Sequence, residues 1–375
     1  MLVQLLTFAS QNQNARYSPR VRRERLGSVD LLRGAVMVLM ALDHTRDFFS
    51  NAGVDPTNLE QAPAALFLTR WVTHFCAPVF VLLAGTGAYL SHRPKRDLQT
   101  FLITRGLWLV VLEVTVVSFA WSFNPRWPFT MLQVIWAIGW CMVGLALLVE
   151  LPAAAVGALG AAIIFAHNLT DGVRGGWLWS VAHRPQVFEP LAGHRVRVPY
   201  PLLPWLGVMA AGYGLGVILE RADRRRWLYA IGGALVAIFV ALRLLGGYGD
   251  PHAFTAPALD FLNCTKYPPS LEYLAMTLGP ALIALAALDG RAGGPLAIFG
   301  RVPLFYYVAH LYLIHGARLA VFAVEKALGR APSHGWSLPV VYAVWLAVVA
   351  ALYVPCRWFA ALKARRRDLA WLSYL

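Results

Sequence analysis

The first long apolar segment of the sequence carries a dense group of ionisable residues. Asp30, Arg33, Asp43, His44 and Asp47 all fall within it. On a helix, at about 100° per residue, Arg33 and His44 lie within about 20° of each other, and Asp30 and His44 within about 40°. One face therefore presents an acid, a base and an imidazole, a combination that suits general acid–base or nucleophilic chemistry. Asp30 and Arg33 are equally explained as an i, i+3 pair that steadies the helix entrance.

Two further segments place polar groups at a similar depth. Arg70 and His74 lie one helical turn apart in the second apolar segment. With His44 they would bring two imidazoles and a guanidinium into the outer half of a membrane. Glu113, in the third segment, would orient an imidazole or pair with a buried arginine. The small residues of the range 84–88 are interpreted as close helix packing.

The later part of the chain adds further candidates. His310 and His315 are five residues apart, about 140° around a helix, so a regular helix aims only one of them at a given site. The sequence does not decide which one. Pro303 predicts a kink near the start of the same segment. Lys266 and Tyr267 precede the eighth segment and are expected to face outward at the membrane surface, as acceptor-binding residues or as an interfacial anchor.

These residues belong to a chain with the composition of a polytopic membrane protein. Of its 375 residues, 58% are hydrophobic and 14% are charged, and the mean hydropathy is +0.56. Soluble domains carry roughly 25% charged residues, so the composition excludes a soluble globular enzyme. We predict an all-α bundle of about ten transmembrane helices of about 20 residues each. The predicted spans cover residues 28–50, 64–91, 98–122, 130–149, 152–168, 201–220, 227–245, 270–288, 296–320 and 338–362.

The formal net charge of +14 is interpreted mainly as a topology signal. One set of alternating loops and ends carries about 17 basic residues and the other about nine, and the positive-inside rule places the richer set in the cytoplasm. Both termini are then cytoplasmic. The predicted organisation is an N-terminal tail over 1–27, one transmembrane domain over 28–362 and a basic C-terminal tail over 363–375. In a soluble protein this charge would favour nucleic acid, which is not expected as a partner here.

The cysteines give no sign of a disulfide framework or a zinc site. Cys76, Cys141, Cys264 and Cys356 are scattered, and no CxxC or Cys/His ligand spacing is present. We therefore expect no metal. An internal repeat of the kind that many transporters carry is not obvious either.

Four motifs, taken in order, resemble one known family. They read Arg25-x-x-Ser28-Val29-Asp30-x-x-Arg33-Gly34, Phe75-Cys76-Ala77-Pro78-Val79-Phe80, Lys266-Tyr267-Pro268-Pro269-Ser270-Leu271 and Gly300-Arg301-Val302-Pro303-Leu304-Phe305-Tyr306-Tyr307-Val308-Ala309-His310. These motifs are similar to those of the bacterial relatives of heparan-alpha-glucosaminide N-acetyltransferase. The resemblance implies a multi-span acyltransferase that moves an acyl group from cytosolic acyl-CoA to a sugar on the far side, by means of an imidazole in the membrane domain.

The resemblance has one departure. The lysosomal enzyme resembles this chain with an asparagine where His44 stands and has its reactive histidine in the following loop, whereas the loop from Ser50 to Pro63 contains no histidine. The wider membrane acyltransferase superfamily, including O-acyltransferases of bacterial polysaccharides, has a histidine at the spacing seen between Asp30 and His44. The resemblance therefore implies His44 as the catalytic imidazole, and it does not carry over the lysosomal substrate.

The predicted site combines the residue pattern with this resemblance. The catalytic candidates are His44, Asp43 and His74. The substrate-binding candidates are Asp47, Arg70, Glu113, Lys266, Tyr267 and His310. Acyl-CoA phosphates require Arg or Lys partners on the cytoplasmic side. The residues expected to bind this cosubstrate are Arg33, Arg93, Arg96, Arg224 and Arg301.

We expect an acyltransferase of the bacterial inner membrane that uses acyl-CoA, in particular acetyl-CoA. Its expected partners are the lipid bilayer and a glycan or small sugar acceptor, and a homodimer is left open. Two alternatives also stay open: a permease in which the imidazoles and carboxylates relay protons, and a non-catalytic protein that binds envelope polysaccharide. The sequence does not fix the acceptor, the acyl chain length, or the choice between a covalent acyl-histidine and direct transfer.

Overall fold

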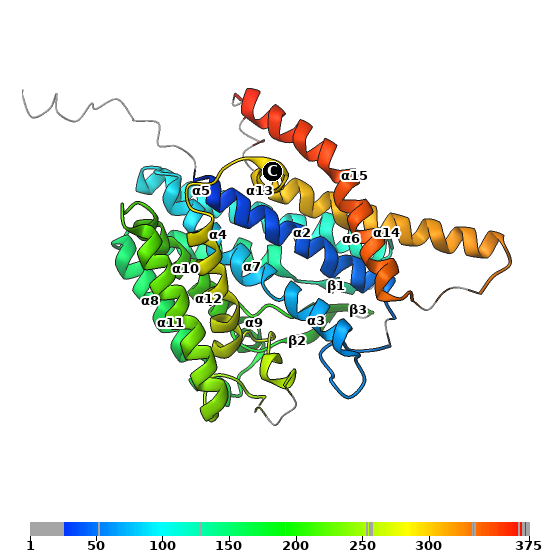
Figure 1. Cartoon of the computed structure of the whole chain (residues 1–375), viewed down its shortest axis with the longest axis horizontal. Helices are drawn as coiled ribbons and strands as arrows, with labels where there is room; N and C mark the ends of the chain where they lie inside the picture. The colour runs from blue at the N-terminus through cyan, green and yellow to red at the C-terminus, as the bar shows by residue number, and fades with distance from the viewer. Residues whose placement is uncertain are drawn as a thin grey trace, which may run out of the picture.

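The protein is a mostly helical bundle, as the computed structural model in Figure 1 shows. The structure describes residues 26–51, 53–127, 129–191, 193–252, 254, 258–331, 333, 335–366, 368–369 and 372. Of the predicted N-terminal tail over 1–27, residues 1–25 lie outside the described residues. The first described helix begins at Gly27, and the last continues to Arg365, three residues into the predicted C-terminal tail.

Ten long helices match the positions of the ten predicted spans. They are α2 (Gly27–Phe49), α4 (Cys76–Leu90), α5 (Lys95–Leu112), α7 (Val134–Leu148), α8 (Ala153–Ala166), α10 (Leu202–Leu219), α11 (Arg224–Leu245), α12 (Leu271–Ala287), α14 (Pro303–Ala327) and α15 (Leu338–Arg365). The shorter segments are α3 (Ala64–Thr73), η1 (Glu113–Val117), α6 (Ser118–Ser122), η2 (His167–Thr170), α9 (Trp177–Ala182), η3 (Asp260–Leu262) and α13 (Gly294–Arg301).

Seven helical stretches in the described chain are long and apolar enough to cross a membrane. They cover residues 64–90, 95–122, 153–170, 202–219, 224–245, 303–327 and 338–365. α7 and α12 are apolar but shorter. α2 has 23 residues but carries the ionisable group described above. The number of crossings therefore remains a prediction, while the helical membrane architecture agrees with the sequence.

Three of the predicted continuous spans are interrupted. Between α3 and α4 the helix breaks at His74, because Pro78 has no N–H to donate to the His74 carbonyl and its ring crowds that carbonyl. The carbonyl instead accepts a hydrogen bond from the Tyr273 hydroxyl at 2.8 Å. The π-helical turn η1 separates α5 from α6. The kink predicted at Pro303 is a full break, with Val302 between α13 and α14.

Pairs of glycines set the closest helix crossings. A Cβ atom on Gly34 would lie 1.8 Å from the Leu296 carbonyl oxygen, and one on Gly300 would lie 1.9 Å from that of Asp30, so α2 and α13 touch backbone to backbone. The same arrangement joins α4 to α10, α5 to α7, α8 to α10 and α11 to α12. Small residues at crossings are typical of membrane bundles, where close packing rather than the hydrophobic effect holds helices together.

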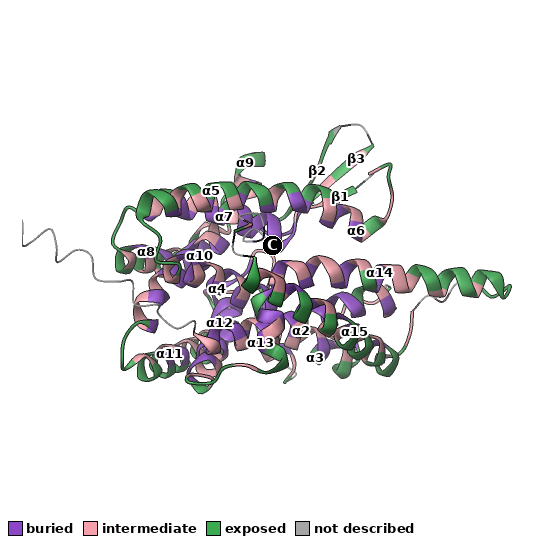
Figure 2. Ribbon diagram, turned by 90° about the horizontal axis from the view of Figure 1, so that it is seen from above, coloured by how far each residue is buried: buried purple, intermediate pink, exposed green. Residues whose placement is uncertain are grey.

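The helices at the centre of the bundle are the most buried, and several of them carry predicted site residues. Figure 2 shows buried residues gathered where α2, α4, α7, α10 and α12 meet, and exposed residues along the far end of α14. In the apolar windows, 61% of the residues of the α3–α4 stretch are buried, against 17% for α15. The exposed side chains of the outer helices include Leu245, Val354 and Trp358, as expected of a surface in contact with lipid.

A small β-sheet lies in the loops, and the all-α prediction did not anticipate it. β1 (Phe129–Met131) follows α6, and the hairpin of β2 (Gln186–Leu191) and β3 (His194–Val198) precedes α10. The strand order is β1-β3-β2, with β1 parallel and β2 antiparallel to β3. The sheet joins the segment before α7 to the segment before α10, two segments that the pattern of apolar spans does not connect.

Candidate functional site

Two buried histidines from distant helices meet at the centre of the bundle. Nδ1 of His44 on α2 lies 2.6 Å from Nε2 of His310 on α14. The two ring planes differ by only 3°. The residues are 7% and 0% exposed, so the pair is shielded from solvent. Of the two histidines on α14, the structure brings His310 to His44. His315, by contrast, hydrogen-bonds the Ala120 carbonyl and stacks on Phe123.

The hydrogen bonds assign a tautomer to each neutral imidazole. Nδ1 of His310 lies 2.8 Å from the Tyr306 carbonyl oxygen, which can only accept, so this nitrogen carries the hydrogen. Nε2 of His310 is then an acceptor, and Nδ1 of His44 must donate to it. The lone pair of His44 is therefore on Nε2, which has no hydrogen-bond partner among the described residues. Such a nitrogen can accept a proton or attack an electrophile.

Aromatic side chains surround the imidazole of His44. The rings of Trp121 and Tyr307 stand edge-on to it, at centroid distances of 5.2 and 5.9 Å. The Tyr307 hydroxyl is buried and has no hydrogen-bond partner among the described residues. The reactive nitrogen thus lies in a mainly apolar environment, in which any charge that forms is only weakly screened.

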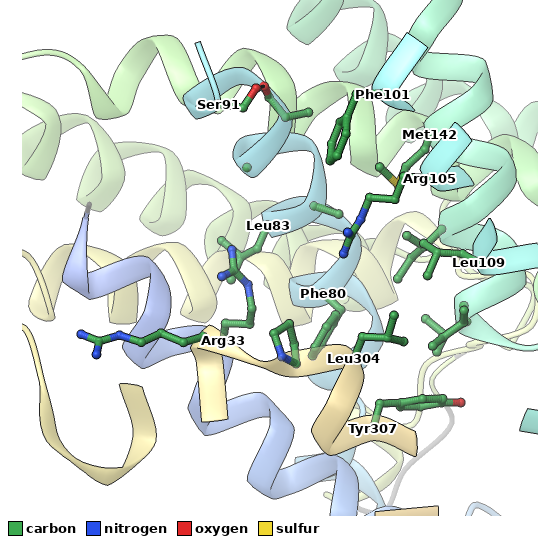
Figure 3. A pocket seen from close by; sticks show the side chains of 18 of the residues that line it. Arg33, Phe80, Leu83, Ser91, Phe101, Arg105, Leu109, Met142, Leu304 and Tyr307 are labelled. Carbon is green, nitrogen blue, oxygen red and sulfur yellow. Dashed lines mark hydrogen bonds between the residues drawn. The ribbon is translucent and has the colours of Figure 1, made fainter. Parts of the chain in front are cut away.

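A cavity of about 310 Å³ with several cationic lining residues lies close to this pair of histidines, although neither histidine lines it. Arg33, Arg93, Arg301 and Lys363, which lie near helix ends, line its mouth; Arg105 lines it further along α5, and its walls are mostly apolar. Tyr307, which contacts both histidine rings, lines it as well. Figure 3 shows Ser91 and Tyr307 at opposite ends of this space and Arg105 pointing into it from α5. A second cavity of about 700 Å³ shares Arg33, Gly87 and Ser91 with the first.

The residues predicted to bind the cosubstrate separate into three groups. Arg33, Arg93 and Arg301 line the first cavity, and Arg224 lines the second together with Arg33. Arg96 lines neither of these two cavities. Sequence reasoning missed Arg105 and Lys363, since Arg105 lies inside an apolar helix and Lys363 was assigned to the C-terminal tail.

The suggested structural role of the Asp30–Arg33 pair is also observed. Arg33 donates to Asp30 at 3.2 Å and to the Gly300 carbonyl at 3.1 Å. It therefore both connects α2 to α13 and lines the cavity. The two roles are compatible, because a guanidinium has five N–H donors.

Asp43 is held by cations rather than by His44. Nη1 of Arg70 lies 2.7 Å from both carboxylate oxygens of Asp43, and the Thr73 hydroxyl also donates to it. Arg46 lies 3.0 Å from Asp43 and 2.5 Å from Asp47. In the described structure, the residue that hydrogen-bonds His44 is His310 rather than the catalytic candidate Asp43.

Lys266 and Tyr267 lie inward rather than at an exposed membrane surface. Lys266 is 8% exposed, and its Nζ lies 5.2 Å from the centre of the Tyr267 ring. It is close enough to act electrostatically on Asp43 and His44. Burial alone would raise the pKa of Tyr267, but the positive charges of Lys266 and Arg70, with a hydrogen bond from Tyr200, hold it below the usual phenol value. The loop thus adds polar groups beside the histidine pair.

Two predicted residues have other surroundings. His74 is buried against Tyr273, and neither of its ring nitrogens has a hydrogen-bond partner in the described chain. The second histidine beside His44 is therefore His310, and not the candidate His74. Glu113 is fully buried on the π-helical turn η1 and accepts a hydrogen bond from the Trp136 N–H at the start of α7. An acceptor at a helix N-terminus satisfies one of its unpaired backbone donors.

A comparison with known families gives one match. The profile described as heparan-alpha-glucosaminide N-acetyltransferase, catalytic, matches residues 25–247, which include α2 with His44 and helices α3 to α11. No match is found among functionally curated proteins. Together with the seven apolar helical stretches, the family match identifies an integral membrane protein.

Proposed function

The chain belongs to the heparan-alpha-glucosaminide N-acetyltransferase catalytic family, and from this premise we propose that it transfers an acetyl or other short acyl group from cytosolic acyl-CoA to a sugar or glycan on the extracytoplasmic side. One observation carries the proposal: an imidazole with its lone pair fixed on Nε2 lies beside a cavity with a basic mouth. The proposed location is the bacterial inner membrane.

The cavity suits an acyl-CoA in its charge and its polarity. Five cationic side chains in the cavity lining offer charge-assisted hydrogen bonds to the phosphates of the nucleotide end. The apolar walls between the mouth and Tyr307 accept the acyl-bearing arm. By the positive-inside rule this mouth is on the cytoplasmic side, where acyl-CoA is available.

His44 supplies the proton transfer. As the acceptor's amine or hydroxyl attacks the thioester carbonyl, Nε2 of His44 takes its proton, the carbon–sulfur bond breaks, and the CoA thiolate leaves and is protonated. The resulting positive imidazole stays hydrogen-bonded to His310 through Nδ1. In the covalent route, Nε2 attacks the thioester first and the acceptor then takes the acyl group from it. Both routes need the same tautomer.

The acceptor binds, in this proposal, on the outer side of His44. Arg70, Asp47, Lys266 and Tyr267 provide hydrogen-bonding groups there, and sugars are recognised by such groups together with aromatic rings. Trp121 supplies an aromatic ring next to His44. The acceptor on this side would face the nitrogen that receives its proton.

The test is a transfer assay on purified protein with labelled acetyl-CoA and a panel of amino sugars and neutral sugars. His44→Ala is expected to lower acyl transfer and acyl-CoA hydrolysis by at least about 10²-fold, because the general base or nucleophile is lost. Thermal unfolding and gel filtration verify that the variant is folded. Full activity of folded His44→Ala would refute the assignment.

Two accompanying measurements refine the proposal. The mass of the intact protein after incubation with acetyl-CoA distinguishes the routes, because an acetylated species that is absent in His44→Ala indicates the covalent one. Reconstituted liposomes test the transport alternative. Solute uptake that is driven by a proton gradient and needs no acyl-CoA would contradict the proposal that the protein is an acyltransferase.

A further inference from the structure

A second histidine cluster lies outside the candidate acyl-transfer site, at the end of α8. His167 and Asp171 come from the turn that ends α8, and His183 follows α9. One nitrogen from each histidine and one carboxylate oxygen of Asp171 all lie within 4.8 Å of one another. His167 and His183 are 3% and 0% exposed, so both imidazoles are buried.

The buried imidazoles lack the hydrogen bonds that a purely structural role would require. Neither ring nitrogen of His167 has a partner among the described residues, and neither does Nδ1 of His183. Nε2 of His183 lies 2.8 Å from Asp171, the one bond that the cluster makes internally. A buried polar atom without a partner costs on the order of 1–3 kcal/mol, so native proteins rarely keep several together without a ligand.

A comparable cluster elsewhere in the chain is satisfied by the protein itself. Asp250, Cys264 and Glu272 also approach within metal-binding distance. There, however, Asp250 accepts hydrogen bonds from Thr265 and Ser270, and Glu272 pairs with Arg243. Of these two clusters, it is therefore the one of His167, Asp171 and His183 in which buried imidazole nitrogens lack partners among the described residues.

We propose that His167, Asp171 and His183 bind one zinc ion. Two neutral imidazoles and a carboxylate are a common ligand set for this ion, with water in the fourth position. Bonds of about 2.0–2.1 Å in a tetrahedral site separate the ligand atoms by about 3.3 Å, which requires only side-chain adjustment from the present spacing. The side chain of Asp171 is 33% exposed and provides the route of entry.

The surrounding hydrogen bonds explain what the ion would stabilise. Asn168 donates to Asp171 at 2.8 Å, and its side-chain oxygen accepts from the Leu271 N–H at 2.9 Å. Leu271 begins α12, directly after the loop that contains Lys266 and Tyr267. Zinc would therefore fix the α8–α9 turn and, through Asn168, the start of α12. Partners of this kind orient metal ligands in known sites.

The test uses the full chain, purified without a polyhistidine tag, stripped with a chelator and titrated with Zn²⁺ alone. Elemental analysis after removal of free ion is expected to find about one zinc per chain in the wild type, and affinity at least about tenfold weaker in His183→Ala and Asp171→Asn. His252→Ala is the matched control, because His252 pairs with Asp260 at 2.9 Å and belongs to neither of the two metal-compatible clusters found among the described residues. It is expected to bind zinc as the wild type does.

A second readout guards against misfolded variants. Zn²⁺ is expected to raise the thermal unfolding temperature of the stripped wild type, and to raise that of Asp171→Asn clearly less at the same zinc concentration. His44→Ala is expected to bind zinc normally, so a failed acyltransferase assignment would not affect this result. Wild type that binds no stoichiometric zinc, or an equal loss of zinc affinity in His252→Ala, would overturn the proposal.

Discussion

At the scale of single residues, the lone pair of His44 depends on a partner 266 positions away in the sequence. Helical geometry placed His44 on one face with Asp30 and Arg33, and the family resemblance implied it as the catalytic imidazole. Its pairing with His310 depends on how α2 packs against α14, and the local sequence pattern contains no information about that packing. Trp121 and Tyr307 were missed for a related reason, because uncharged aromatic residues in apolar helices are usually packing residues.

The first prediction concerns His310, which acts through His44 as a positioning residue. His310→Ala removes the acceptor that keeps the hydrogen of His44 on Nδ1, so kcat is expected to fall by about 10²- to 10⁴-fold. KM for acetyl-CoA should change little, because His310 does not line the cavity. Steady-state kinetics give both values.

The control is His315→Gln, on the same helix. His315 hydrogen-bonds Ala120 and does not contact His44, so its kcat is expected to stay near that of the wild type. Equal losses of kcat in the two variants would indicate a general effect of the helix rather than a specific effect on His44.

The second prediction concerns the basic mouth of the cavity. Arg93→Ala removes a cationic side chain that lines the cavity and stacks on Phe101 at 4.1 Å. KM for acetyl-CoA is expected to rise about 10- to 100-fold with kcat unchanged, since a charge-assisted contact contributes about 1.5–3 kcal/mol. Added salt should raise the wild-type KM in the same direction.

Arg225→Ala is the control variant for Arg93→Ala, because it also removes one positive charge. Arg225 also lies over an aromatic ring, that of Tyr229, at 5.7 Å, but it lines neither of the two cavities. A rise in KM for Arg225→Ala as large as that for Arg93→Ala would mean that overall charge, rather than the cavity, attracts the donor.

At the scale of elements, long apolar runs predicted where the ten helices lie, because bilayer thickness fixes their length. The breaks within them were harder to predict. Pro303 was identified as a break signal and Pro78 was not interpreted as one, while the π-helical turn η1 has no residue signature of its own. The sheet was missed because its strands are short: β2 and β3 lie in a loop rich in Gly, Pro and aromatics, and residues 130 and 131 of β1 were assigned to the span 130–149.

The third prediction tests the interpretation of the small-residue run 84–88 as helix packing. A Cβ atom on Gly85 would lie 2.0 Å from the Met209 carbonyl oxygen on α10, and one on Gly87 meets nothing within 4 Å. Gly85→Ala is expected to destabilise the protein by about 1–3 kcal/mol, because overpacking against backbone exceeds the helix-propensity gain of about 1 kcal/mol. Thermal unfolding in detergent measures the change.

Gly87→Ala serves as the internal comparison, two residues further along the same helix. It keeps the propensity gain without the clash, so its unfolding temperature is expected to equal or exceed that of the wild type. If both variants lost the same stability, the backbone contact between α4 and α10 would not be the cause.

At the scale of the whole molecule, the His167 cluster is built from residues in or directly after η2 and α9, which contribute neither to the histidine pair nor to the lining of the first cavity. The basic mouth was predictable in outline because positive charge collects on the cytoplasmic face. The His167 cluster was not predictable, since two histidines and a carboxylate at these separations have no characteristic metal-binding spacing in the sequence. Its members meet only because α9 packs beside the end of α8.

The last prediction concerns orientation, on which the assignment of donor and acceptor sides depends. All four native cysteines are buried, so single cysteines can be added to the natural chain and labelled directly. Val187→Cys on β2 and Arg330→Cys after α14 are expected to react with a membrane-impermeant maleimide in intact cells. Ala222→Cys and Arg365→Cys are expected to react only after permeabilisation, because the positive-inside rule places both in the cytoplasm. Labelling of Ala222→Cys in intact cells would show that the protein has the opposite orientation in the membrane. The basic mouth would then open away from the compartment that contains acyl-CoA.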